Sequence, residues 1–215
     1  IQRNPLCGRN FEYFSEDPYL AGTLAEEYIR GLQENGVGAC VKHFCCNNLE
    51  YNRFNQSSEV DERTLRELYY KPFEIACRAK PLSAMCSYNR INGTYASEYK
   101  KGFDVLRGEL GFNGTVYSDW DSVRDRSKAA KAGIDIEFPF NKNNYERLAA
   151  DYAAGVLSEK ELDACAARVL DLCYRCEEMR KRRKAISSVN ERIQTAKHIA
   201  EEGMVMLKND GILPL

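Results

Sequence analysis

Polar or aromatic residues that could do chemistry follow three short apolar runs of the sequence. The runs are "GACV", "SAMC" and "TVY", and the residues are Lys42 with His43, Tyr88 with Asn89, and Asp119 with Trp120. A carboxylate can act as a nucleophile, and charged and neutral groups together hydrogen-bond hydroxyls. An indole offers an apolar platform to the C–H face of a sugar ring. The combination therefore points to carbohydrate chemistry.

These residues need a fold that brings strand ends together. The sequence predicts strands at 38–44, 83–89, 114–120 and 134–139, separated by helical patterns. Repeated strand, loop and helix is typical of a parallel α/β architecture, because parallel neighbours need a crossover connection. In a (β/α)₈ barrel the active site lies at the carboxyl ends of the strands. The three residue pairs would then converge on one face.

The helices carry recognisable start and stop signals. One is predicted over 15–36, where an apolar stripe repeats every four residues and Gly36 ends the run; the stripe is Leu20, Leu24, Tyr28 and Leu32. Asp61 is a candidate N-cap for the helix that follows, which Pro72 could kink. Ser158 and Glu161 have the spacing of a capping box.

Each candidate site residue also has an ordinary structural interpretation. A strand-end aspartate is most often a helix N-cap, so Asp119 or Asp121 could cap the helix that follows. His43 could be a hydrogen-bonded structural histidine, and Lys42 could simply pair with a carboxylate. The other two basic candidates, Arg9 and Arg53, could be surface residues.

Composition excludes several classes of protein. The 215 residues are 44% hydrophobic and 29% charged, with a net charge of −1, so the chain has enough apolar material for a core. That balance gives no overall field to attract nucleic acid or an acidic membrane, and no apolar run is long enough to span a bilayer. The basic run at 179–184 is interpreted as a solvated helix end, because no aromatic residues are interleaved with it.

Cysteine is abundant, but no pattern favours a metal site. The nine cysteines are an odd number, which fits reduced thiols and a cytoplasmic location. If "CVKHFCC" is a strand, Cys45 and Cys46 point to opposite faces and cannot easily share a metal with His43. The Cys173-x-x-Cys176 pair lies in an amphipathic helix pattern and is read as two small apolar residues. No metal and no cofactor is predicted.

Taken together, the motifs resemble glycoside hydrolase family 3, in particular its β-glucosidase branch, over essentially the whole chain. The similar segments are "GRNFEYFSEDPYLAG", "GACVKHFCCNNLEYNRF", "VDERTLRELYYKPFEIA", "AMCSYNRINGTYAS", "GFNGTVYSDW" and "KAGIDIEFP". The resemblance implies an α/β fold, the C-terminal part of a (β/α)₈ TIM-type barrel truncated at both ends. Residues 1–178 would belong to the barrel. Residues 179–215 would begin the linker to an absent α/β-sandwich domain.

The resemblance also implies a function: a retaining exo-acting β-glucosidase that removes terminal β-D-glucosyl residues. Asp119 of "SDW" matches the family's nucleophile. The implied substrate-binding residues are Arg9, Lys42, His43, Arg53, Met85, Tyr88 and Trp120. The partner would be a β-glucoside or oligosaccharide, with no nucleic acid and no membrane, and a homo-oligomer of the full-length enzyme is left open.

The sequence departs from the family pattern in ways that bear on mechanism. A "KHFPGHG"-like loop of an N-acetylglucosamine-removing branch reads "KHFCCNNLE" here, so the acid/base histidine of that branch is missing, and the usual Met-Pro-Gly is "FPF". The acid/base glutamate and an upstream sugar-binding aspartate are expected outside the chain, so the chain alone should be inactive or a poor catalyst. The alternatives are a β-xylosidase or broad exo-glycosidase, a non-catalytic sugar-binding remnant, and a metal or redox protein.

Overall fold

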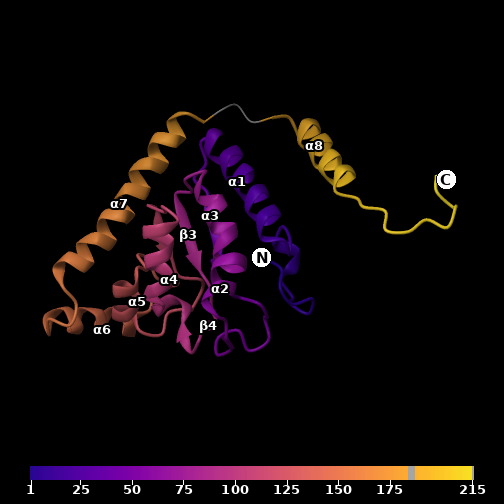
Figure 1. The fold of residues 1–215 in the computed structure, drawn as a ribbon. Coiled ribbons are helices and arrows are strands. Elements are labelled where there is room, and N and C mark those ends of the chain that lie inside the picture. Colours follow the sequence, from indigo (N-terminus) through magenta and orange to yellow (C-terminus); the bar gives the residue numbers. More distant parts are fainter. Residues whose placement is uncertain (184–186, 215) are drawn as a thin grey trace. The chain divides into compact units, whose positions relative to one another are not determined.

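A computed structural model describes residues 1–183 and 187–214 (Figure 1). The chain divides into two compact units, Ile1–Arg183 and Lys184–Leu215. The second unit carries helix α8 (Val189–Glu202), which begins at a capping box formed by Ser188 and Glu191. All strands of the described residues, and all the predicted site residues, lie in the first unit.

The site rests on a parallel sheet. Its strands are β1 (Cys40–Phe44), β3 (Ser83–Cys86) and β6 (Thr115–Tyr117), in the order β1-β3-β6. Both pairings are parallel, and helical crossovers connect each strand to the next. The carboxyl ends of all three strands therefore meet at one edge, as the sequence pattern predicts.

The fourth predicted strand, "IDIEFP", is reduced to a single bridge. Ile136 pairs in parallel with Tyr117, and the backbone N–H of Ser118 donates to the carbonyl of Ile136 at 2.9 Å. The prediction of a full strand was wrong in extent, although the segment follows β6 in the predicted direction. Among the described residues no further strand flanks it, so one side of the ladder is missing.

Helices surround the sheet, and most begin where the sequence predicts. Their bounds are α1 (Pro18–Glu34), α2 (Glu62–Thr64), α3 (Lys71–Cys77), α4 (Lys100–Asp104), α5 (Arg126–Ala132), α6 (Lys142–Ala153) and α7 (Glu159–Lys181). Asp61 caps α2 through the N–H of Thr64 at 2.9 Å, and Ser158 with Glu161 caps α7, both as predicted. A π-helical segment (Leu65–Tyr70) joins α2 to α3 just before Pro72. A small second sheet combines β2 (Ser57–Ser58), β4 (Arg90–Ile91) and β5 (Thr94–Tyr95).

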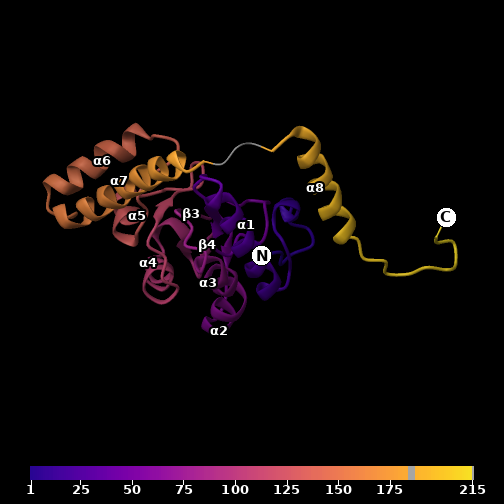
Figure 2. The same ribbon diagram turned by 90° about the horizontal axis from the view of Figure 1, so that it is seen from above.

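Helix α1 forms where the sequence predicts a helix and packs closely on α3. Figure 1 and Figure 2 both show α1 beside α3, and the two helices are in contact. A Cβ on Gly22 would lie 2.8 Å from Cβ of Ile75, so only a glycine allows this approach. The small residues of α1 therefore face α3. Of the apolar stripe, Leu20, Leu24 and Tyr28 are exposed, whereas Leu32 packs against a core cluster.

Aromatic packing fixes the end of β1, next to the first predicted site residues. The ring of Phe44 stacks on Tyr70 at 5.6 Å between centroids and meets Phe73 edge-on at 5.0 Å. Phe103 completes the cluster at 5.9 Å. Edge-to-face and stacked rings are worth about 0.5–1.5 kcal/mol each beyond burial. The cluster holds the backbone that carries Lys42 and His43.

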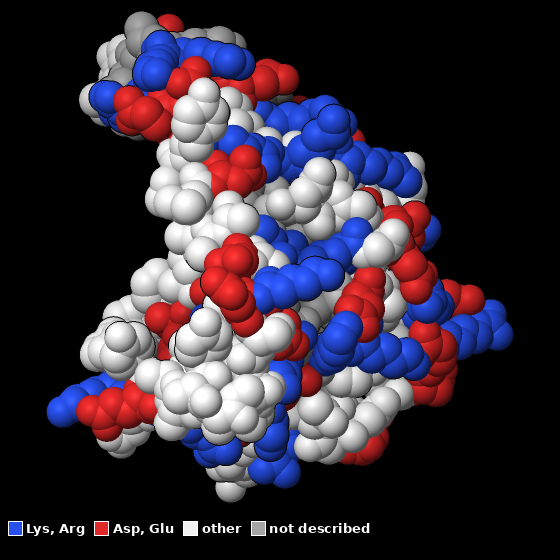
Figure 3. Space-filling model, turned by 90° about the vertical axis from the view of Figure 1, so that its left-hand side faces the viewer, with Lys and Arg blue, Asp and Glu red and all other residues white. Residues whose placement is uncertain are grey.

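The charged surface is mixed in sign. On the face that carries α6 and α7, Lys and Arg alternate with Asp and Glu (Figure 3). Within the basic run, Arg180 pairs with Glu177 and Lys181 with Glu178, both at 2.7 Å, as expected of a solvated helix end. Across the described ranges, no helix combines the length and apolarity needed to cross a bilayer.

Candidate active site

Asp119 lies just beyond the carboxyl end of β6, and its two carboxylate oxygens have different surroundings. Oδ1 accepts the backbone N–H of Trp120 at 2.7 Å, which fixes the orientation of the carboxylate. Oδ2 is buried and accepts no hydrogen bond, yet it lies 3.4 Å from Nε2 of His43 and 3.9 Å from Nη1 of Arg9. Helix α5 is capped by Asp125 instead, so the N-cap interpretation of Asp119 does not hold.

His43 is held as a neutral ring. Nη2 of Arg9 lies 3.0 Å from Nε2, and a guanidinium can only donate, so Nε2 is the acceptor. The proton then resides on Nδ1, which donates to the hydroxyl of Tyr13 at 2.9 Å. Burial, followed by the cations Arg9 and Lys42, lowers the pKa of His43 to about 3. The ring therefore has no proton to give to Asp119, which explains why Oδ2 is free.

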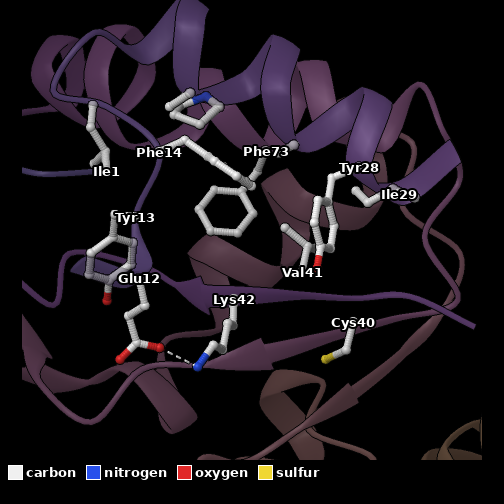
Figure 4. A pocket seen from close by; sticks show the side chains of 13 residues that line it. Ile1, Glu12, Tyr13, Phe14, Tyr28, Ile29, Cys40, Val41, Lys42 and Phe73 are labelled. Atoms are coloured by element: carbon white, nitrogen blue, oxygen red, sulfur yellow. Dashed lines mark hydrogen bonds and ion pairs between the residues drawn. The ribbon is translucent and has the colours of Figure 1, made fainter. Parts of the chain in front are cut away.

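Glu12 is a member of the site that the sequence analysis missed. Its carboxylate pairs with Nε of Arg9 through one oxygen and with Nζ of Lys42 at 2.5 Å through the other (Figure 4). Burial opposes its charge, but hydrogen bonds from Arg9 and Lys42 lower the pKa of Glu12 to about 2. The one available signal was that Glu12 follows Arg9 by three residues. A 3₁₀ turn (Asn10–Glu12) places the two side chains on the same side of the chain, where they pair.

A second charged pair lies on the Tyr88 side of the site. Arg53 donates to Glu50 at 2.6 Å, and its guanidinium lies 4.2 Å from the ring centre of Tyr88. Burial and the adjacent Asp119 carboxylate raise the pKa of Tyr88 to about 12. Tyr88 is thus a neutral phenol against the carboxylate. Like Glu12, Glu50 was missed by the sequence analysis.

The structure brings Arg9, His43, Tyr88 and Asp119 together, and links Lys42 to them through Glu12. Met85 and Trp120 are more loosely placed. Met85 is half-buried on β3, opposite Tyr117 in the register, and Trp120 is 60% exposed. Within the part of the chain that the structure describes, neither side chain takes part in a hydrogen bond. Their predicted contact with a sugar stays a prediction.

These pKa shifts predict that the free energy of unfolding falls with acidification in two steps. An unfolded His43 takes up a proton as pH drops below 6.5, whereas the folded residue does so only near 3. Folding therefore loses stability from pH 6.5 downward. Glu12 adds a second loss below pH 4.5, because its carboxylate stays charged in the fold down to about 2.

Urea unfolding at several pH values tests the first step. The variant His43→Gln should flatten the dependence between pH 6.5 and 4.5, whereas His198→Gln, on α8, should leave it unchanged. An equally steep fall in His43→Gln and in the unmodified chain would contradict the buried neutral histidine.

An apolar cavity of about 400 Å³ lies on the other side of Lys42, beside the free edge of β1 (Figure 4). Its walls include Phe14, Tyr28, Val41 and Phe73. Asp119 and His43 do not line it. Apolar walls suit hydroxyl groups poorly, so we do not place a sugar ring there.

The two adjacent cysteines contradict one sequence expectation. Strand β1 ends at Phe44, and Cys46 has a φ of +66°, so Cys45 and Cys46 do not alternate as strand residues would. Their sulfurs lie 3.5 Å apart, both buried, rather than on opposite faces. His43 is engaged by Arg9 and Tyr13. Among residues 1–183 and 187–214, no group of three or more His, Cys, Asp or Glu side chains is arranged to hold a metal ion.

Comparison with known proteins gives a consistent family assignment. Residues 1–172 match the family model described as "Glycosyl hydrolase family 3 N terminal domain". The chain is 44% identical over 219 residues to "Thermostable beta-glucosidase B" of Acetivibrio thermocellus, covering all of this chain and 29% of that protein. It is 42% identical to "Exo-alpha-(1->6)-L-arabinopyranosidase" of Bifidobacterium longum, again covering 100% of this chain and 29% of the relative.

A solved structure supports the fold. The chain superimposes on beta-glucosidase 3B from Thermotoga neapolitana in complex with glucose with a TM-score of 0.91 and 40% identity, covering 100% of this chain and 32% of that one. The chain thus spans less than a third of the length of these relatives.

Proposed function

Because the chain belongs to glycoside hydrolase family 3, we propose that it carries the nucleophile and part of the sugar-binding site of a retaining exo-β-glucosidase. Asp119 is the nucleophile, forming a covalent glycosyl-enzyme. Members of this family have a TIM-barrel-type N-terminal domain, and the parallel sheet of this chain is consistent with part of one.

One observation carries the proposal: the free Oδ2 of Asp119. A nucleophilic carboxylate must be oriented, charged and unblocked on the attacking oxygen. The N–H of Trp120 orients Asp119 through Oδ1, and Arg9 at 3.9 Å supplies positive charge. Oδ2 accepts no hydrogen bond despite its burial. Leaving a buried carboxylate oxygen unpaired costs stability, which is typical of functional groups.

The reaction follows from this arrangement. Oδ2 attacks the anomeric carbon while the bond to the leaving oxygen breaks, and the leaving oxygen takes the electron pair and a proton. Water then displaces Asp119 from the opposite face, which regenerates the carboxylate and releases glucose with its β configuration. Two inversions give net retention.

The proton donor is expected outside these residues. Glu12 is unsuited to the role, because a pKa of about 2 keeps it ionised at neutral pH. Glu50 is held by Arg53 at 2.6 Å. The relatives extend well beyond the matched region, and we propose that the acid/base glutamate is supplied from there. On the same grounds we treat residues 1–178 as barrel and 179–215 as the start of a linker.

Sugar recognition is assigned to the charged groups around Asp119. The Arg9, Glu12 and Lys42 cluster alternates donors and acceptors, which matches the hydrogen-bonding demands of hydroxyl groups. Neutral His43 serves as a hydrogen-bonding group rather than as an acid. Arg53 and Tyr88 close the other side, and Trp120 and Met85 contact the ring or its substituents.

The test compares two substrates that differ in their need for a proton. The isolated chain should cleave 2,4-dinitrophenyl β-D-glucoside slowly and cellobiose not measurably, because general acid catalysis is worth about 10²–10⁴-fold and only cellobiose depends on it. Proton NMR of the first product should show β-glucose. Initial release of α-glucose would contradict retention. Efficient cleavage of cellobiose would place the acid within these 215 residues.

A second candidate is an exo-glycosidase with a different or broader sugar preference. The relative from Bifidobacterium longum, named an arabinopyranosidase, is nearly as similar as the first β-glucosidase, at 42% against 44% identity. Parallel assays with activated β-glucoside, β-xyloside and α-L-arabinopyranoside distinguish the candidates. A higher kcat/KM for the β-xyloside or the α-L-arabinopyranoside than for the β-glucoside would replace the glucoside assignment. The assignment of Asp119 as the nucleophile would stay the same.

A further inference from the structure

A row of alternating arginine and aromatic side chains extends from the candidate active site. We call it the arginine–aromatic row; its members are Arg53, Phe54, Tyr88, Arg90, Tyr95 and Arg124. Tyr88 meets Phe54 edge-on at 4.9 Å, and the guanidinium of Arg124 lies 5.4 Å from the ring centre of Phe54 and 5.5 Å from that of Tyr95. At the far end, Arg90 lies 4.4 Å from the ring centre of Tyr95 and donates to its hydroxyl at 2.8 Å.

The row is continuous with the nucleophile at two points. Tyr88 lies close enough to Asp119 for the carboxylate to perturb its phenol. Arg124 donates from Nη1 to the carbonyl of Asp121 at 2.9 Å, two residues after Asp119 in the same loop. A group that leaves from a sugar bonded at Asp119 would therefore find the row within the same site.

The outer end of the row is positively charged. The inner cation, Arg53, is neutralised by Glu50 at 2.6 Å. By contrast, Arg90 and Arg124 form no ion pair with any carboxylate of residues 1–183 or 187–214, and Nε of Arg90 is buried without an acceptor. The hydrogen bond from Arg90, together with the nearby Arg124, outweighs burial and lowers the pKa of the Tyr95 hydroxyl. Among the described residues, no carboxylate therefore neutralises the outer end of the row.

We propose that the outer part of the arginine–aromatic row (Phe54, Arg90, Tyr95 and Arg124) is the leaving-group subsite and that it selects a planar aglycone bearing a carboxylate, such as a hydroxybenzoate. The planar ring would pack against the edges of Phe54 and Tyr95, whose faces already carry arginine side chains. The guanidinium of Arg124, with Arg90 beyond it, would bind the carboxylate. A neutral sugar in this subsite would offer Arg90 and Arg124 no negatively charged acceptor. The inference rests on the proposed function.

The kinetic test uses two glucosides that differ chiefly in charge. The substrates are 4-carboxy-2-nitrophenyl β-D-glucoside and its 4-carboxamide, whose activated leaving groups need little protonation. The carboxamide phenol is the slightly better leaving group, so this electronic difference works against the expected preference. The chain should favour the carboxylate by about 3–5-fold in kcat/KM at low ionic strength, the effect of one partly exposed ion pair. Salt near 1 M should remove the preference, because the Debye length falls to about 3 Å.

Variants assign the preference to the row. Arg124→Gln should abolish the preference while retaining hydrolysis of the carboxamide, and Arg124→Lys should keep part of it. Arg63→Gln removes the same charge from an arginine that is 83% exposed and paired with Glu67 on the surface, so it should behave as the unmodified chain. A preference that is absent, or that persists in Arg124→Gln, overturns the proposal.

A binding measurement separates this proposal from the proposed function. Saturation-transfer NMR should detect 4-hydroxybenzoate more strongly than 4-hydroxybenzamide, and Arg124→Gln should equalise them. Arg124-dependent benzoate binding without any hydrolysis would contradict the slow turnover expected of this chain and keep an anion subsite. Hydrolysis of both glucosides with equal kcat/KM would keep the activity and refute the subsite. Neither hydrolysis nor selective binding would refute both.

Discussion

Asp119→Asn is expected to lower kcat for an activated aryl β-glucoside by at least about 10³-fold, the scale seen when a catalytic group is removed. Asparagine has almost the same shape, and it can still accept the N–H of Trp120 through its amide oxygen. It cannot, however, form the glycosyl ester, because the second position is a neutral amide nitrogen. The loss should appear with every leaving group, since it affects attack rather than protonation.

A matched control lies two residues away. Asp121 is exposed, and Asp121→Asn should retain most of the activity. Circular dichroism and urea unfolding should show that both variants are folded. Turnover by folded Asp119→Asn within tenfold of the unmodified chain would remove Asp119 from the chemistry, whatever its position.

The largest effect on stability is expected for Asp135→Asn. The Asp135 carboxylate is fully buried and accepts from Arg168 at 2.8 Å, from Arg107 at 3.1 Å and from the backbone N–H of Val116 at 2.8 Å. It therefore ties α7 and the helical segment of Arg107 to β6. Removing one partner of a buried ion network leaves guanidinium charge uncompensated, and we expect the free energy of unfolding to fall by about 3–5 kcal/mol.

Urea unfolding followed by the fluorescence of Trp120, the single tryptophan, measures this change. Asp104→Asn is a suitable control, because Asp104 pairs with Lys100 at the surface and its side chain is 61% exposed. That substitution should change the free energy of unfolding little. A loss below about 1 kcal/mol in Asp135→Asn would show that water or side-chain rearrangement compensates the buried arginines.

The parallel α/β pattern and the strand-end position of the site could be predicted from the sequence. Apolar runs separated by helical patterns allow few arrangements, and in all of them parallel strands end at one edge. Lys42, His43, Tyr88 and Asp119 follow from that rule. The family motifs then added roles for these residues, which remain proposals.

What could not be predicted depends on contacts between distant segments. Glu12 lies 30 residues before Lys42, and only the packed fold shows that one carboxylate neutralises both Lys42 and Arg9. The packing of α1 on α3 has a similar origin, because Gly22 matters only through its approach to Ile75. The arginine–aromatic row likewise joins three separate segments of the chain, at residues 53–54, 88–95 and 124.

Two other errors came from extending a strand prediction beyond the residues that form a strand. The alternation expected of a strand stops at Phe44, where the chain turns, so Cys45 and Cys46 meet instead of diverging. In "IDIEFP" the composition favours a strand, but a ladder requires neighbours, and only Ile136 is bridged. Strand propensity measures how well side chains fit a half-buried sheet surface. It does not ensure that a neighbouring strand is present to form the hydrogen bonds.

The central claim is that Asp119 forms a covalent bond to the anomeric carbon, and the most direct test is to trap that bond. The chain is incubated with 2,4-dinitrophenyl 2-deoxy-2-fluoro-β-D-glucoside, whose leaving group needs no acid and whose fluorine slows release of the intermediate. Intact-protein mass spectrometry should show one added fluoroglucosyl unit, peptide mapping should place it on Asp119, and Asp119→Asn should not be labelled. Labelling of another carboxylate, or equal labelling of Asp119→Asn, would contradict the account.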